Sequence, residues 1–149
     1  MSTGQSAPEL KAPLVEILGL NVGFAGANAD RPIVIDVDLT IRPGECVALV
    51  GESGSGKSVS ALSVLKLLPY PTASHPSGAI RFRGRDLLTA SDQEMREVRG
   101  NDISIIFQEP MTSLNPVLTI GEQIAESLRR HEAVTRKQAL ERTIEMLKL

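Results

Sequence analysis

The chain has 149 residues, a length that suits one domain able to bury about two-thirds of its unfolded surface. Its hydrophobic content of 42% and charged content of 23% are ordinary globular values, while a net charge of −2 and an aromatic content of 3% argue against nucleic-acid binding. No apolar run approaches the about 20 residues of a membrane-spanning helix, and the N-terminus lacks a secretory signal, so a cytosolic location is the default expectation.

The first elements predicted along the chain are a tail and two strands. Residues 1–13 are small and polar with two prolines, which predicts a flexible tail. Residues 14–24 alternate between apolar and polar positions and predict a strand. After a turn-rich loop, residues 33–41 alternate strictly and predict a second strand with one apolar face. The residues expected on that face are Ile33, Ile35, Val37, Leu39 and Ile41.

A strand, a glycine-rich loop and a helix are predicted to follow in order. Residues 45–50 form a short apolar run that predicts a buried strand, in which the single cysteine, Cys46, serves as a packing residue. Residues 51–58 fit the pattern G-x-x-x-x-G-K-[ST] of a phosphate-binding P-loop. From residue 59 to residue 68 apolar positions recur at helical spacing, and Pro69 ends this predicted helix.

The loop of residues 51–58 holds the residue types that phosphate binding requires. Its glycines let the backbone approach a phosphate closely, and the amides of residues 54–58 can form a nest for phosphate oxygens at the positive end of the next helix. Lys57 can bridge the β- and γ-phosphates, and the Ser58 hydroxyl can ligate Mg²⁺. The alternative is a glycine-rich turn between two core elements. The strand before the loop and the helix after it favour nucleotide binding.

The segment after this helix predicts a loop and then an edge-like strand. Residues 70–78 contain turn-forming residues and predict a loop in which His75 is solvated. Residues 79–84 alternate apolar with basic positions, which predicts a strand with Ile80 and Phe82 pointing inward.

A short helix and another buried strand are expected next. Ser91 with Glu94 forms the pattern of a capping box, which predicts a helix over residues 92–98. The apolar run of residues 103–107 predicts a buried strand.

Two amphipathic helices are predicted in the last part of the sequence. The first covers about residues 120–131, and the second starts from an N-cap at Thr135. The expected apolar faces are Ile120, Ile124, Ala125 and Leu128 on the first helix and Ala139, Leu140, Ile144 and Leu147 on the second.

Motifs outside the P-loop make the chain resemble the ATP-binding cassette (ABC) transporter family. Phe24 on an early strand and the segment 103–110 after the loop carry this resemblance, which covers residues 14–149. Within the family, residues 51–60 and 107–116 look like those of dipeptide and oligopeptide importer ATPases. Segments 84–88 and 95–100 are similar to the same subgroup.

The resemblance implies an α/β P-loop NTPase fold of the ABC type, present in part. It implies an N-terminal β-subdomain and part of a RecA-like core up to about residue 108, then the start of a helical subdomain over about residues 109–149.

The resemblance also implies site residues. Phe24 matches the A-loop aromatic that stacks on adenine, although a packed core aromatic is the alternative. Gln108 matches the Q-loop glutamine that approaches Mg²⁺ and the attacking water, although an ordinary loop glutamine is the alternative. Ser58 and Gln108 are the metal-facing residues. The full nucleotide-binding set is Phe24, Gly51, Glu52, Ser53, Gly54, Ser55, Gly56, Lys57, Ser58, Val59 and Gln108.

ATP and Mg²⁺ are the cofactors that the resemblance implies, and transport proteins are the partners. These partners are a second ATP-binding subunit, transmembrane permease subunits and, indirectly, a solute-binding protein. The implied location of the chain is peripheral, at the cytoplasmic side of the inner membrane. The implied role is to power import of peptides or similar small solutes.

Three family motifs do not occur in the sequence: the Leu-Ser-Gly-Gly-Gln signature, a strand ending in Asp-Glu and the switch histidine. We therefore expect the chain to be the N-terminal part of a longer ATPase, able to bind ATP weakly and to hydrolyse almost none alone. A P-loop small-molecule kinase and an inactive fragment remain as alternatives.

Overall fold

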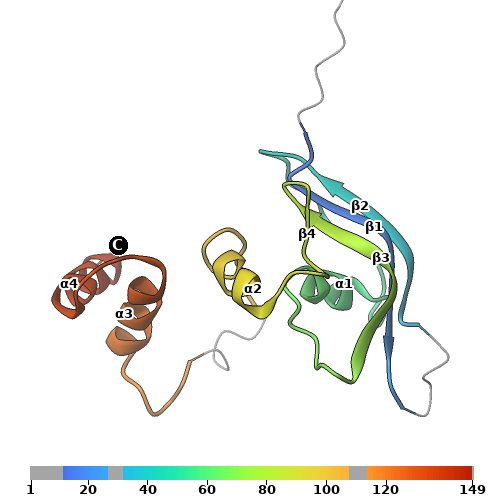
Figure 1. The fold of residues 1–149 in the computed structure, drawn as a ribbon. Helices are drawn as coiled ribbons and strands as arrows, with labels where there is room; N and C mark the ends of the chain where they lie inside the picture. The colour runs from blue at the N-terminus through green and yellow to red at the C-terminus, as the bar shows by residue number, and fades with distance from the viewer. Residues whose placement is uncertain (1–11, 27–31, 108–113, 149) are drawn as a thin grey trace, which may run out of the picture. The chain divides into compact units, whose positions relative to one another are not determined.

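The computed structural model describes residues 12–26, 32–107 and 114–148 of the chain (Figure 1). The chain divides into two compact units, Met1–Met95 and Arg96–Leu149. Most of the predicted tail and the Q-loop candidate Gln108 lie outside the described residues. No helix in the described part of the chain combines the length and apolarity needed to cross a bilayer.

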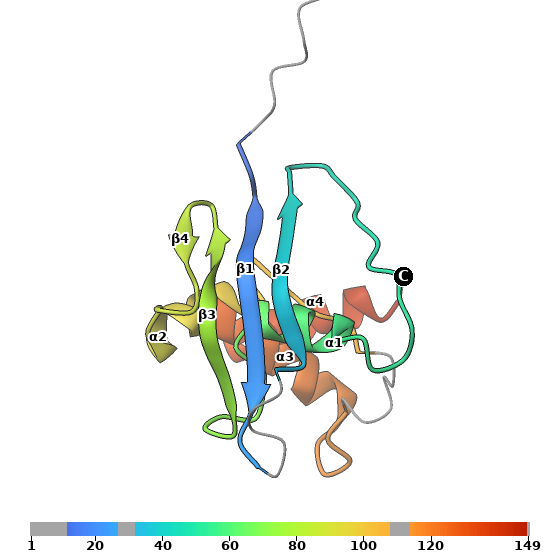
Figure 2. The same cartoon turned by 90° about the vertical axis from the view of Figure 1, so that its right-hand side faces the viewer.

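The first unit contains an antiparallel sheet of four strands in the order β2-β1-β3-β4 (Figures 1 and 2). The bounds are β1 Val15–Phe24, β2 Val34–Ile41, β3 Ala73–Phe82 and β4 Arg85–Asp86. The predicted inward positions Ile80 and Phe82 are buried, with 0% and 7% of their surface exposed. The other apolar residues of this core that are at most 3% exposed are Ile17, Leu20, Val22, Val34, Leu65, Ala73, Leu87 and Met95.

Strand β2 forms, but the prediction that its apolar positions share one inner face is wrong. Between Val37 and Val34 the strand carries one extra residue relative to β1, at Asp36, whose φ is +49°. This bulge reverses the alternation of side chains, so Val34 is buried while Ile33 and Ile35 are 48% and 66% exposed. The amide of Asp36 donates to Asn21 Oδ1 at 3.2 Å, a side-chain partner at the bulge.

The same side chain joins all three long strands of the sheet. Asn21 belongs to β1, and its Nδ2 donates to the carbonyl oxygen of Gly19 at 3.0 Å and to Ser77 Oγ on β3 at 2.9 Å. Together with the bond from Asp36 on β2, these contacts fix the register of β1 against both neighbours at this level.

The helix after the glycine-rich loop is α1, Lys57–Val64, which lies against one face of the sheet in both views (Figures 1 and 2). It ends earlier than the prediction of residues 59–68. The reason is Lys66, which has a left-handed φ of +49° and whose Nζ donates to the carbonyl oxygens of Leu88 and Ala90 at 3.2 and 3.0 Å.

Two predicted core strands are wrong. Residues 45–50 and 103–107 form no strand; Ile103 makes one isolated bridge to Arg99. Val50 and Ile106 are 92% and 95% exposed. An apolar run becomes a strand only when neighbours pair with its backbone, and no described residue forms a ladder with either segment.

The burial predicted for Cys46 is also wrong. Its thiol lies on the exposed segment 45–50 rather than in a core strand. The prediction depended on the pairing of that strand, so the two errors have one cause.

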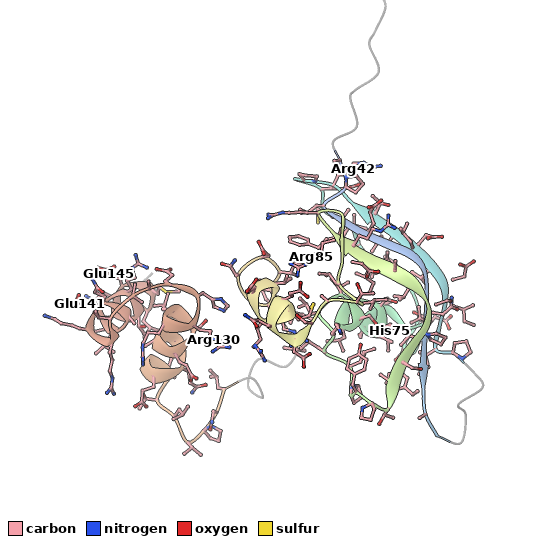
Figure 3. All side chains as sticks on the ribbon, viewed as in Figure 1. Arg42, His75, Arg85, Arg130, Glu141 and Glu145 are labelled. Carbon is pink, nitrogen blue, oxygen red and sulfur yellow. The ribbon has the colours of Figure 1, made fainter. Side chains whose placement is uncertain are left out.

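The prediction of a solvated loop around His75 is wrong as well. Strand β3 already begins at Ala73, so His75 is a half-buried strand residue (Figure 3). Desolvation by burial lowers the pKa of the imidazole, and the positive charge of Lys66 lowers it further. The Nδ1 atom lies 3.4 Å from the hydroxyl oxygen of Tyr70.

Three helices follow, as the sequence predicts: α2 Asp92–Val98, α3 Ile120–His131 and α4 Arg136–Met146. Each begins with a capping box, in which a hydroxyl and a carboxylate or amide exchange hydrogen bonds with backbone amides. The pairs are Ser91 with Glu94, Thr119 with Glu122 and Thr135 with Gln138.

The predicted apolar faces of α3 and α4 are only partly buried in the second unit. Ala125 and Ala139 are buried as expected, together with Thr143. Ile124 and Leu128 are half-buried, and the other predicted positions are exposed. These are Ile120, Leu140, Ile144 and Leu147.

The capping box of α2 should make stability depend on pH through Glu94. Hydrogen bonds from the backbone and hydroxyl of Ser91, with the nearby charge of Arg85, lower the pKa of this carboxyl (Figure 3). A lowered folded-state pKa stabilises the fold above the unfolded-state pKa, and this contribution disappears as pH falls through the folded-state value. Between neutral pH and about pH 3, the melting temperature of Glu94→Gln should therefore fall less than that of the unaltered chain.

Thermal unfolding followed by circular dichroism at stepped pH measures this effect. Glu97→Gln makes the same chemical change on an exposed position of the same helix and is the matched control. Identical pH profiles for the two variants would contradict the assignment to Glu94.

Candidate nucleotide-binding site

The backbone of the loop before α1 is shaped to receive an anion. Gly54 and Gly56 have φ values of +82° and +85°, and Gly56 is the N-cap of α1. No side chain caps this helix, and no acidic residue occupies its first turn. The first amides of α1 therefore have no capping side chain, at the end of the helix where the dipole favours negative charge.

Gly56 also fixes where the loop lies on the sheet. A Cβ at this position would be 3.1 Å from Val34 Cγ2 and 3.2 Å from the carbonyl oxygen of Ile33. The left-handed backbone and this close approach together require glycine. The loop is thus packed against the beginning of β2.

The side chain of Lys57 points back into the loop. Its Nζ donates to the carbonyl oxygens of Gly51 at 2.8 Å and Glu52 at 2.6 Å, and to Ser55 Oγ at 3.1 Å. The ammonium therefore lies among the groups that would surround a bound phosphate, as the P-loop assignment expects.

The other predicted loop residues are mostly accessible. Glu52, Ser53, Ser55 and Ser58 are exposed, and Val59 is half-buried in the first turn of α1. The described residues contain no group of three or more His, Cys, Asp or Glu side chains able to hold a metal ion. Magnesium at phosphate sites takes few protein ligands and several from phosphate and water, so the Ser58 hydroxyl fits this chemistry.

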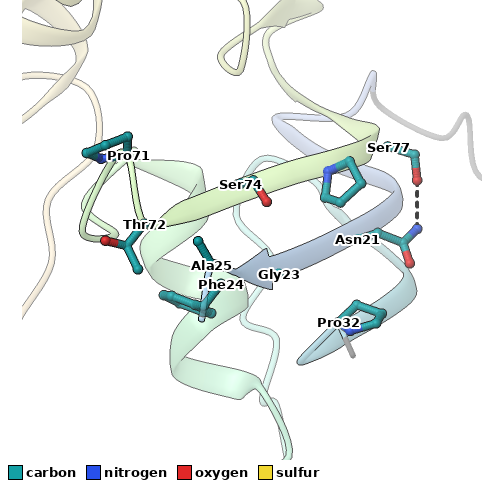
Figure 4. A pocket seen from close by; sticks show the side chains of 10 residues that line it. Asn21, Gly23, Phe24, Ala25, Pro32, Pro71, Thr72, Ser74 and Ser77 are labelled. Carbon is teal, nitrogen blue, oxygen red and sulfur yellow. Dashed lines mark hydrogen bonds between the residues drawn. The ribbon is translucent and has the colours of Figure 1, made fainter. Parts of the chain in front are cut away.

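Phe24 lines a groove of about 560 Å³ at the end of β1 (Figure 4). Its side chain is half-buried, so part of it is available to a ligand. Three prolines and several short polar side chains form the remaining walls. The lining residues are Asn21, Gly23, Phe24, Ala25, Pro32, Pro71, Thr72, Ser74, Pro76 and Ser77.

The groove and the loop meet at the same end of the sheet. Pro32 lines the groove, and the next residue, Ile33, has its carbonyl oxygen against Gly56. The amide of Ile33 donates to the carbonyl oxygen of Val22 at 2.8 Å, on the strand that ends at Phe24. An apolar groove thus adjoins the glycine-rich loop, an arrangement that suits a nucleotide with its base and phosphates apart.

Sequence reasoning identified the loop and Phe24 but missed the three prolines of the groove. In the sequence they signal turns, and only the pairing of β1 with β3 brings Pro71 and Pro76 beside Phe24. The stacking role of Phe24 and the metal role of Ser58 stay predictions.

The sequence profile of the ABC transporter family matches residues 34–149. The chain belongs to this family, and the predicted P-loop NTPase fold is confirmed. Among solved structures, an ATP-bound bacterial Atm1-family ABC exporter superposes with a TM-score of 0.52 and 25% identity. The match covers 84% of this chain and 19% of that one.

Curated relatives include transport ATP-binding proteins of bacteria. A peptidoglycan transport ATP-binding protein of Agrobacterium fabrum is 57% identical over 91% of this chain and 25% of its own length. An oligopeptide transport ATP-binding protein of Bacillus subtilis is 42% identical over 91% of this chain and 38% of its own length. The chain therefore spans between a quarter and two-fifths of these relatives.

Proposed function

We propose that this chain is a nucleotide-binding part of an ATPase subunit that powers peptide import by an ABC transporter. The observation that carries the proposal is the loop of residues 51–58, with Lys57 turned into it and an uncapped helix behind it. The family match supports ATP as the nucleotide. The names of the relatives, which include oligopeptide and peptidoglycan transport, support a peptide-type solute.

Each part of the site has a proposed role. The amides of residues 54–58 hold the β-phosphate, while Lys57 offsets the charge of the γ-phosphate. The groove beside Phe24 takes the adenine, with the ring stacked on the base. The Ser58 hydroxyl, and Gln108 by family resemblance, face Mg²⁺, which neutralises charge on the phosphates when bound.

Hydrolysis and transport are proposed for the whole assembly. A second ATP-binding subunit would supply the signature sequence opposite this loop, and a glutamate on an Asp-Glu-ended strand would polarise the attacking water. Permease subunits, a solute-binding protein and a peripheral position at the inner membrane follow from the same role. Neither the comparisons nor any contact among the described residues favours the small-molecule kinase.

Calorimetry with two ligands tests the division between base groove and phosphate loop. Phe24→Ala should weaken MgATP binding by about 5- to 100-fold, because stacking on one base contributes about 1–3 kcal/mol. The same variant should bind inorganic pyrophosphate as the unaltered chain does, since pyrophosphate lacks a base. Phe24→Tyr keeps an aromatic ring and is the matched control.

Two outcomes would count against the proposal. Loss of pyrophosphate binding in Phe24→Ala would mean that the residue supports the fold rather than the base. If the unaltered chain shows no magnesium-dependent binding of ATP in calorimetry, the proposed function itself is rejected.

A further inference from the structure

Every donor of the Lys57 ammonium is already engaged within the loop. An ammonium has three N–H donors, and Lys57 Nζ makes three hydrogen bonds, to Gly51, Glu52 and Ser55. A phosphate oxygen can therefore accept a hydrogen bond from this ammonium only if one of the three existing bonds is given up. Phosphate binding to the loop would therefore replace one hydrogen-bond partner of the Lys57 ammonium by another, rather than add a new hydrogen bond.

Ser55 provides the bond that is easiest to exchange. Its Oγ lies 3.1 Å from Nζ, whereas the two carbonyl oxygens lie at 2.8 and 2.6 Å. Ser55 is exposed, so water can solvate its hydroxyl once the ammonium has left. The carbonyl oxygen of Glu52 also accepts a hydrogen bond from the Ser55 amide at 3.3 Å, which holds this acceptor in the turn where the lysine reaches it.

The hydroxyl lies close to the start of the loop. A Cβ at Gly51 would lie 2.8 Å from Ser55 Oγ and 3.8 Å from Lys57 Nζ. The hydroxyl, the ammonium and the Gly51 backbone therefore converge on one point, and the hydroxyl is not an incidental neighbour.

We propose that Ser55 is a positioning residue that holds Lys57 in a resting place and thereby lowers the affinity of the loop for phosphate. The inference rests on the proposed function, because it concerns how strongly the same site takes up its nucleotide. Removing the hydroxyl leaves one donor of the ammonium without a protein partner and ready for a phosphate oxygen. Ser55→Ala should therefore bind more tightly, not less.

Titration calorimetry with MgATP and with inorganic pyrophosphate provides the test on the full chain. Ser55→Ala should bind both ligands about two- to tenfold more tightly, because one solvent-exposed hydrogen bond of the ammonium no longer has to be exchanged for the phosphate. Ser55→Thr keeps the hydroxyl and should restore the unaltered affinity. Ser127→Ala makes the same chemical change on exposed surface of α3 and should change neither constant.

A double-mutant cycle separates an effect through Lys57 from a general change in the loop. In a Lys57→Ala background, Ser55→Ala should leave pyrophosphate affinity unchanged, because no ammonium remains to be released. Circular dichroism confirms that each variant is folded.

The possible outcomes test the Ser55 inference separately from the proposed nucleotide-binding function on which it rests. Suppose that the unaltered chain binds both ligands and that the affinity of Ser55→Ala is equal or weaker. This result would overturn the inference and leave the proposed function standing. The inference is also overturned if Ser55→Ala still raises the affinity for pyrophosphate in the Lys57→Ala background. An unaltered chain that takes up neither ligand overturns the proposed function, and the inference with it.

Discussion

Replacing Lys57 by alanine should weaken MgATP binding by about 10- to 100-fold, the largest effect expected from any single side chain of the loop. Hydrogen bonds to charged partners contribute about 1.5–3 kcal/mol, and the ammonium is the cation that contacts the loop carbonyls where the phosphates are proposed to bind. Titration calorimetry of the purified chain measures the change directly.

The control for this variant has to separate a local effect from a change in net charge. Lys137→Ala removes the same charge from α4, where the side chain is 87% exposed. It should bind MgATP as the unaltered chain does. Equal losses in the two variants would mean that overall charge, rather than the position of Lys57, governs binding.

The same substitution tests the role in import when it is placed in the gene that encodes this chain. Cells carrying Lys57→Ala should lose ATP-dependent uptake of radiolabelled oligopeptides, while uptake of an unrelated solute continues. Unchanged peptide uptake, with ATP binding lost in calorimetry, would reject the peptide-import part of the proposal and retain the nucleotide site.

Gly78→Ala should cause the largest loss of stability that one methyl group can produce in this sheet. The residue has φ +97°, and an added Cβ would lie 2.6 Å from both the carbonyl oxygen of Gly19 and Leu20 Cα on the neighbouring strand. Left-handed strain costs about 1–2 kcal/mol, and overpacking against the backbone adds about 1–3 kcal/mol. The melting temperature should fall by about 4–20 °C.

Gly84→Ala is the matched control because it isolates the backbone strain. Gly84 has a similar φ of +81°, but a Cβ there would meet nothing within 4 Å. Thermal unfolding should show only the smaller strain contribution for this variant. Comparable losses at the two positions would contradict a close approach of β1 and β3 at Gly78.

Local chemistry explains which parts of the fold could be predicted. The capping box that starts α2, the N-cap of α4 at Thr135 and the motif around Lys57 depend on residues close together in sequence, so their patterns could be recognised; the capping box of α3 at Thr119 is equally local but was not predicted. The reversal of faces at Asp36 depends on one extra residue opposite β1, which alternation within β2 cannot reveal. Residues 45–50 are exposed because no described strand pairs with them, and an apolar run does not specify whether such a pairing neighbour exists.

The candidate site shows the same division. The loop residues were identified from their own pattern, whereas the groove depends on long-range pairing that brings Pro71 and Pro76 beside Phe24. His75 was misplaced for a related reason, since the proline and glycine that indicate a turn occur here within β3. Such residues signal turns only on average, and strand pairing can include them at bulges.

The amide group of Asn21 has a consequence for the proposed nucleotide site. Because one side chain joins three strands just before Phe24, the groove wall proposed to lie beside the base is preorganised before any ligand arrives. Little backbone entropy then has to be lost on binding at that wall. If the proposed site binds nucleotide, conformational adjustment is then expected at its other end, where the flexible side chain of Lys57 would exchange its partners.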